Sequence, residues 1–183
     1  MPFGTPPLIY LPMYGNNAGK NYGTGGDFTV NSGPFTGARG PNEFWGNKAD
    51  FDGSTGYLAR TSALSGVSDG KTFSASFWVN VDTAGCDLLS INTSGGVGRF
   101  GILHSSTDGS KLRLTGKNAA GTTVLEAVTV TTLTAGSSYF VQLSVDLANT
   151  ANRCIYVNGV LDTTTWTTYS NDTINLSQTN QLS

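Results

Sequence analysis

The amino-acid sequence predicts an all-β protein folded as an antiparallel β-sandwich, and three observations carry this prediction. Several segments alternate apolar and polar residues with a period of two, the pattern of a strand with one buried face. Turn-forming pairs such as Asp69-Gly70 and Asn158-Gly159 recur at roughly the 8–12-residue spacing of short sandwich strands. Only 12% of the residues are charged, and Thr and Val outnumber Glu and Lys, which disfavours helices.

The first third of the chain predicts short strands joined by long loops. Residues 15–47 are rich in Gly and Asn, which indicates surface loops around a short strand rather than a linker to a second domain. We therefore expect residues 1–183 to form one domain of ordinary size. The strands expected in this part are Leu8–Met13, Phe28–Asn31, Ala49–Asp52 and Gly56–Arg60.

The clearest strands are predicted at Phe73–Asp82 and Tyr139–Leu147, where every second residue is apolar. One face of each strand is therefore expected to point into the core. Trp78 falls on the polar face of its strand, with serines and asparagine. Further strands are expected at Leu88–Asn92, Arg99–His104, Lys111–Gly116 and Thr122–Val130.

A tight hairpin is predicted within Arg153–Asp162. Its Asn158-Gly159 pair separates two alternating apolar runs, and such a pair favours the positive φ angles of a type I′ turn. This is the strongest local signal in the chain, because the turn type and the strand pattern on both sides agree.

The order of these segments resembles the concanavalin A-like and laminin-G-like jelly rolls of the lectin and glucanase type. The resemblance rests on Phe51-Asp52-Gly53 with Tyr57, on the Phe73–Val79 strand, and on the Tyr156–Gly159 hairpin, and it spans roughly residues 8–165. It implies a jelly-roll sandwich in which Asp52 belongs to a structural turn. Because modules of this kind are encoded by bacteriophages, it also implies a virion protein.

The end of the sequence departs from that pattern. Modules of this family usually continue after the region of Ile174–Ser177 to a final strand that pairs near the first one, whereas this sequence ends at Ser183. The alternatives are an incomplete sequence, a short module, or a neighbouring chain that completes the sheet by donating a strand to an open edge.

Catalytic chemistry is not expected. Retaining glycosidases need two carboxyl groups about 5–5.5 Å apart, but Glu43 and Glu126 have no acidic neighbour at strand spacing. Asp50 and Asp52 share a face, yet the family resemblance implies a structural turn for Asp52. His104 is the only histidine and no Gly-x-Ser-x-Gly elbow occurs, so His104 is expected to be structural or exposed.

No cofactor is expected, although calcium remains an alternative because related modules bind it through carboxylate, amide and carbonyl oxygens. The candidate calcium ligands near loops are Asp82, Asp87, Asp146, Asn149 and Asn152. One histidine and two cysteines cannot form a zinc set alone. Gly95–Gly98 lacks the lysine and the following helix of a phosphate-binding loop.

Aromatic side chains are the remaining candidates for a binding site, because exposed rings stack on sugar faces. The candidates for carbohydrate binding are Trp45, Trp78, Trp166 and Tyr169. Alternatively, each of these rings covers a sandwich edge or fills the inner core.

Several features that the sequence lacks limit the compartments and partners that we expect. The Met1–Pro7 segment lacks the features of a secretory signal, and no apolar run approaches the roughly 18 residues of a membrane span. A net charge of −2 gives no electrostatic footprint for nucleic acid. Cys86 and Cys154 are expected to be two free, buried thiols rather than a disulfide.

Three functions stay open at this point. The first is a non-enzymatic structural or adhesion component of a bacteriophage virion (head decoration, fibre or tail-associated). It would act through contacts with other virion proteins, as a homo-oligomer, and would bind a surface glycan as a further partner. The second is an extracellular carbohydrate-binding module of a secreted protein. The third, a hydrolase, has the least support from the carboxylate spacing.

Overall fold

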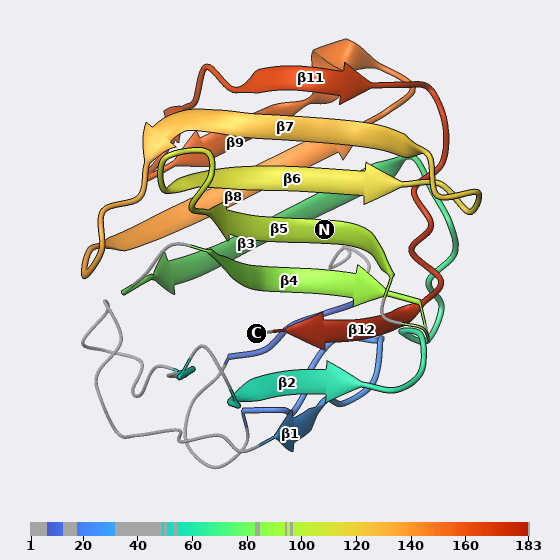
Figure 1. Ribbon diagram of the computed structural model, residues 1–183. Helices are drawn as coiled ribbons and strands as arrows, with labels where there is room; N and C mark the ends of the chain where they lie inside the picture. Colours follow the sequence, from blue (N-terminus) through green and yellow to red (C-terminus); the bar gives the residue numbers. More distant parts are fainter. Residues whose placement is uncertain are drawn as a thin grey trace, which may run out of the picture.

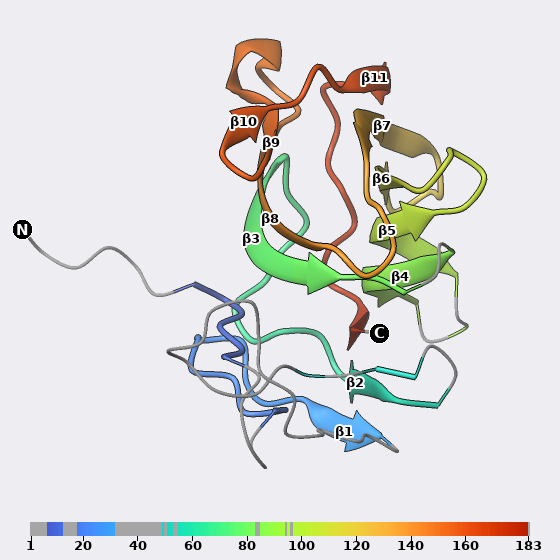
Figure 2. The same ribbon diagram turned by 90° about the vertical axis from the view of Figure 1, so that its left-hand side faces the viewer.

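The computed structural model describes residues 7–12, 18–31, 49, 51–52, 55–82, 85–93, 95 and 97–182. In it, two antiparallel β-sheets pack face to face, as Figures 1 and 2 show from two sides. The predicted antiparallel β-sandwich is therefore confirmed. No helix in these residues is long and apolar enough to cross a membrane.

The larger sheet has eight strands in the order β1-β2-β12-β4-β5-β6-β7-β11. Its strands are β1 (Thr29–Asn31), β2 (Tyr57–Arg60), β4 (Cys86–Asn92), β5 (Gly98–Ser105), β6 (Lys111–Lys117), β7 (Thr123–Thr132), β11 (Thr165–Tyr169) and β12 (Thr179–Leu182). The core of this sheet, β4 to β7, is a meander in which each strand pairs with the next along the chain.

The smaller sheet has four strands in the order β10-β9-β8-β3. Its strands are β3 (Thr72–Asn80), β8 (Ser138–Asp146), β9 (Cys154–Val157) and β10 (Val160–Leu161). A short 3₁₀ turn, η2 (Thr150–Asn152), precedes β9. The long pair β3–β8 keeps one register over nine residue pairs without a bulge, so its two faces stay distinct along the whole strand.

The core forms where the alternating residues of the two sheets meet. Phe77 on β3 pairs with Val141 on β8, and Val141 is fully buried against the larger sheet. In the larger sheet, the ring of Phe100 on β5 faces Phe73 of β3, and the centroids of the two rings are 4.5 Å apart. A smaller cluster around Phe28, Leu58 and Leu64 packs beside β1 and β2. The period-two pattern thus predicted the inward faces of β3 and β8 correctly.

The predicted hairpin is present as β9 and β10. Its two turn residues have positive φ angles, 52° at Asn158 and 79° at Gly159, as a type I′ turn requires. The Asn158 side chain adds to this turn, because its Oδ1 accepts a hydrogen bond of 2.8 Å from the Phe140 backbone N–H.

Two predicted strands are absent among the described residues. The first, Leu8–Met13, is irregular over Leu8–Pro12, and Met13 lies outside the described residues. The buried Asn21 side chain holds this segment, since Asn21 Nδ2 donates to the Leu8 carbonyl and Asn21 Oδ1 accepts from the Tyr10 N–H. The second, Ala49–Asp52, forms no strand at its described positions, and Asp50 is not described. Of the loops expected at 15–47, residues 18–31 are described and include β1.

The closing strand that the family pattern called for is formed by this chain itself. Thr179–Leu182 form β12, which pairs with β4 on one side and with β2 on the other. No strand donated by a neighbour is needed at this place. The strand escaped the sequence analysis because its four residues, Thr-Asn-Gln-Leu, contain one apolar residue and no alternation.

The two thiols lie on different sheets and are free, as expected. Cys86 begins β4, and Cys154 begins β9. Both are half-buried, not buried as predicted, and partial burial raises the pKa of the Cys86 thiol, which keeps it protonated at neutral pH.

Two aspartates connect distant parts of the fold and make its stability depend on pH. Burial opposes ionisation of Asp69 and Asp162, but hydrogen bonds to their carboxylates outweigh it and lower the pKa of each carboxyl below its ordinary value. The unfolded chain therefore binds more protons than the folded one in acid. We expect the free energy of unfolding to be constant above about pH 5 and to fall as the pH drops through the folded pKa values.

Urea denaturation between pH 2.5 and pH 7 measures this effect. The acid-sensitive part of the curve should shrink in Asp162→Asn, whose carboxamide cannot ionise. An unfolding free energy that rises on acidification below pH 4 would contradict the expectation.

Candidate functional site

The outer face of the smaller sheet carries a band of exposed aromatic and apolar side chains. We call Trp78, Phe140, Tyr156 and Leu161 the outer strip. Register pairs place them on one face, because Trp78 pairs with Phe140, and Tyr156 pairs with both Gln142 and Leu161. The outer strip thus crosses all four strands from β3 through β8 and β9 to β10.

These side chains are accessible in the described part of the chain. Trp78 is 56% exposed, Leu161 55% and Tyr156 36%, while Phe140 is half-buried beneath its neighbours. The Trp78 and Phe140 rings lie 5.2 Å apart, centroid to centroid, and are tilted by 36°. Neighbouring strands are about 4.8 Å apart, so the outer strip extends over roughly 14 Å across the sheet.

Neutral polar groups fill the spaces within the outer strip. Gln142 lies two residues from Phe140 on β8 and pairs with Tyr156 on β9, while Ser76 of β3 pairs with Gln142 from the other side. At the β3 end, Asn80 Nδ2 donates to the Gly136 carbonyl and to Ser138 Oγ. The register places no charged residue on this face from Ser74 to Asn80 of β3 or on the facing positions of β8. Such a surface fits an uncharged ligand or partner.

The other aromatic candidates do not belong to this face. Trp166 pairs with the fully buried Ala127, and both Trp166 and Tyr169 pack on the core between the sheets. Arg153 covers them, with its Cζ 4.9 Å from the Trp166 ring centroid and 4.5 Å from that of Tyr169. The Tyr169 hydroxyl donates to the Asp146 carbonyl at 2.7 Å. Trp45 lies outside the described residues.

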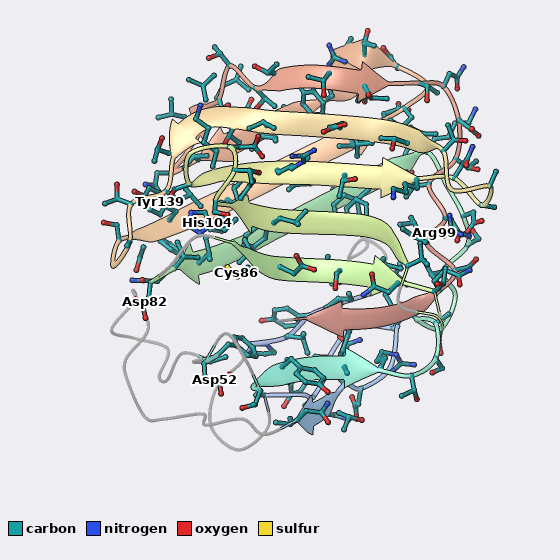
Figure 3. The ribbon with its side chains drawn as sticks, viewed as in Figure 1. Asp52, Asp82, Cys86, Arg99, His104 and Tyr139 are labelled. Atoms are coloured by element: carbon teal, nitrogen blue, oxygen red, sulfur yellow. The ribbon has the colours of Figure 1, made fainter. Side chains whose placement is uncertain are left out.

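Of the carboxylates weighed as catalytic groups, Asp52 and Glu126 are engaged in structural bonds, while Glu43 and Asp50 lie outside the described residues. Asp52 Oδ1 accepts hydrogen bonds from the backbone N–H groups of Thr55 and Gly56, each 2.7 Å long. Glu126 on β7 is bonded to Arg113 on β6, which also reaches Asp108 at 3.2 Å. Figure 3 shows Asp52 on a loop at the edge of the molecule.

His104 is buried at 2% exposure on the inward face of β5, beside its register partner Cys86. The labels in Figure 3 place the two residues together, with Arg99 at the other end of β5. The sequence predicted that His104 is structural or exposed, and the structure places it in the core.

The outer face of the larger sheet carries a shallow hollow of about 150 Å³ above Gly101. Asp87, Ser90 and Thr115 line it, and burial raises the pKa of the Asp87 carboxyl. The other carboxylate on this face, Glu126, is three strands away, which corresponds to roughly 14 Å. That separation exceeds the roughly 5–9.5 Å between the two carboxyl groups of glycosidases.

The calcium candidates divide into three places. Asp146, Asn149 and Asn152 come together around η2, where Asn152 Nδ2 donates to Asp146 Oδ2 at 3.1 Å and Asn149 Oδ1 accepts from the Ala151 N–H. Asp82 follows the end of β3 opposite to the one that pairs with Asp146. Asp87 lines the hollow of the other sheet. Among the described residues no three His, Cys, Asp or Glu side chains gather.

The sequence analysis identified Trp78 but missed the rest of the outer strip. Phe140 belongs to the face of β8 opposite its buried residues, and Tyr156 and Leu161 belong to the short hairpin. The available signal was a large apolar residue at a non-core position of each strand, aromatic on β3, β8 and β9 and leucine on β10. Only the register between strands brings these positions together.

No protein-family model matches this chain, and no curated protein matches it.

Proposed function

We propose that this protein is a non-enzymatic structural and adhesion component of a bacteriophage virion, attached as a head decoration, fibre or tail-associated protein. Contacts with neighbouring virion proteins hold it in the particle. The outer strip is its adhesive face. The single observation that carries the proposal is this exposed band of three aromatic rings and a leucine, with no charged residue at the facing positions of β3 and β8 from Ser74 to Asn80.

The composition of the outer strip supports an adhesive role. Trp and Tyr are the side chains most enriched at the energetic centres of interfaces, and at the outer strip they lie on rigid strands that need no ordering upon binding. Many weak copies of such a contact, repeated by the symmetry of a particle, give strong attachment through avidity. The resemblance to phage-encoded jelly rolls supports the virion setting.

Electron microscopy of the source phage, labelled with an antibody against the purified protein, tests this setting. Label on the shell, the fibres or the tail is expected. Label absent from every intact particle, with the protein present in the same culture, would overturn the proposal.

A carbohydrate-binding module of a secreted protein is the second candidate, and the alternation of rings and neutral polar groups along the outer strip favours it. Rings stack on sugar faces, while Gln142 and Ser76 offer amide and hydroxyl groups for hydrogen bonds. The same face would also serve a virion protein that binds a host glycan, so the labelling experiment separates the two settings.

Replacing Trp78 by alanine should reduce binding to the partner of the outer strip about thirtyfold. Truncating an aromatic anchor residue costs about 2 kcal/mol of binding free energy, and Trp78 contributes the most exposed ring of the outer strip. Host-cell binding by flow cytometry and a glycan array measure the two candidate partners in parallel.

Tyr22→Ser is the matched control. Tyr22 is exposed to nearly the same degree, 53%, but its ring packs on Tyr10 outside the outer strip. Equal losses in both variants, or none in Trp78→Ala, would contradict the assignment of the outer strip. Loss of cell binding without any glycan signal would favour a protein partner.

A further inference from the structure

The segment Ile174–Leu182 is held in place by residues that are distant in the sequence. Ile174 exchanges two backbone hydrogen bonds with Gly70, of 3.2 Å and 2.7 Å. The Asn175 N–H donates to the Lys117 carbonyl at 2.9 Å. β12 then pairs with β2 and β4. Within the described residues, none of these backbone contacts is to β11, which precedes the segment along the chain.

Two kinds of contact anchor the first part of the segment. Ile174 and Leu176 are buried in the main core, at 0% and 7% exposure. The Asp69 carboxylate accepts four hydrogen bonds of 2.7–3.0 Å, from Asn175 Nδ2, the N–H groups of Leu176 and Ser177, and Ser177 Oγ. We call the buried residues Ile174 and Leu176 the plug, and the Asp69 carboxylate that accepts these four hydrogen bonds the aspartate clamp.

The second part of the segment fills a slot in the larger sheet. Gln181 pairs with Ala59 of β2 on one side and with Ser90 of β4 on the other. Without β12, β2 and β4 would each present an unpaired edge, which a strand of suitable register readily fills. Figure 1 shows β12 lying between β4 and β2, joined to the rest of the chain by a long connection along the side of the sandwich.

The connection between β11 and the segment, residues 170–173, is held mainly by polar bonds. Asp172 accepts from Asn118 Nδ2 at 2.8 Å and from the Thr173 N–H at 2.7 Å. Opening this connection disrupts those bonds and leaves β11 paired with β7. The connection can therefore act as a hinge, since a few loop residues suffice to absorb such a change.

We propose that Ile174–Leu182 exchanges between two copies of this chain, so that the segment of each copy fills the slot of the other. An identical copy offers the same slot, core pocket and aspartate clamp, so every contact of the segment Ile174–Leu182 is remade in the exchanged pair, and only the bonds of the connection at residues 170–173 are lost. A reciprocal exchange closes after two copies and leaves no edge open. This interface is separate from the outer strip, so it links copies while that face stays accessible.

Cysteine pairs test the exchange directly. One preparation of the full chain carries Ser90→Cys and another carries Gln181→Cys. The two positions are Cα register partners, and antiparallel partners lie about 4.5–5.5 Å apart, within disulfide range. After mixing and mild oxidation, we expect a mixed disulfide dimer by mass spectrometry. It forms only when β12 of one copy lies beside β4 of the other, because Ser90 is buried at 5% exposure.

A mixture of Thr72→Cys and Gln181→Cys chains is the matched control for random collision, since Thr72 is exposed and pairs with Asp146 instead. The exchange predicts at least tenfold more mixed dimer from the Ser90→Cys mixture. Adding Asp69→Asn should speed its formation about tenfold, because the clamp loses a charge-assisted hydrogen bond.

Mixed dimer at the control level would overturn the proposal. Should Ser90→Cys fail to fold, Ala59→Cys replaces it, because Ala59 is the partner of Gln181 on β2. A monomer by analytical ultracentrifugation at all concentrations, with and without Asp69→Asn, would overturn it independently.

Discussion

Replacing Phe100 by alanine should lower the free energy of unfolding by about 4 kcal/mol, the largest effect we expect from one side chain. Phe100 is 2% exposed at the centre of the core, and its ring packs on Phe73 across the two sheets. Removing it leaves a cavity lined by strands of both sheets, which are fixed by their ladders and cannot collapse into the space. The loss combines the transfer free energy of the ring with this cavity.

Urea denaturation followed by tryptophan fluorescence measures the change. Leu103→Ala is the matched control, because Leu103 lies on the same strand but borders the outer hollow instead of the core. We expect it to cost about 1 kcal/mol. Equal losses from the two substitutions would mean that the inward and outward faces of β5 are wrongly assigned.

The second large effect is expected from Asp69→Ala, which should cost about 3 kcal/mol. The substitution leaves four donors without their acceptor, on Asn175, Leu176 and Ser177, and Asn175 is 5% exposed. A lost hydrogen bond to a charged group costs about 1.5–3 kcal/mol, while partial solvation of Ser177 reduces the total. Since these residues lead into β12, the loss should be concentrated at β2, β12 and β4.

Hydrogen exchange separates this local effect from a general one. In Asp69→Ala the amides of β2 and β12 should lose protection while those of β6 and β8 keep it. Asp172→Ala is the control, because Asp172 also accepts two hydrogen bonds but lies before the plug, and we expect it to cost under about 1 kcal/mol. Uniform loss of protection would contradict the role of Asp69 as a local clamp.

Most of the sandwich could be predicted because long strands leave a clear trace in the sequence. β3 and β8 alternate over nine residues each, and their buried faces follow directly from that pattern. The Asn158-Gly159 turn could be predicted for a local reason, since few residue pairs adopt two positive φ angles.

The alternation of apolar and polar residues does not predict a strand correctly where tertiary contacts determine the structure. β11 is rich in threonine and carries a register shift between Trp166 and Thr168, so its residues do not alternate. The stretch from Leu8 to Pro12 has strand-like residues, yet the side chain of Asn21 binds its backbone and replaces a strand partner.

The binding face is harder to predict than the fold, for a geometric reason. Trp78 and Trp166 look alike in the sequence, since polar residues lie two positions before and two positions after each of them. The tertiary contacts of Trp166, which packs on the core and is covered by Arg153, distinguish its ring from the exposed ring of Trp78. Whether a tryptophan ring is packed or exposed thus depends on residues that are distant in the sequence.

The place of β12 also has a consequence for biosynthesis. β2 and β4 are made early but become neighbours in one sheet only through residues made about 90 to 120 positions later, so the contact order of the fold is high and folding is expected to be slow. While the chain emerges from the ribosome, the meander β4 to β7 can assemble before the β1–β2 unit is attached. The nascent chain therefore passes through an intermediate in which β1–β2 and β4–β7 have formed but are not yet joined into one sheet by β12.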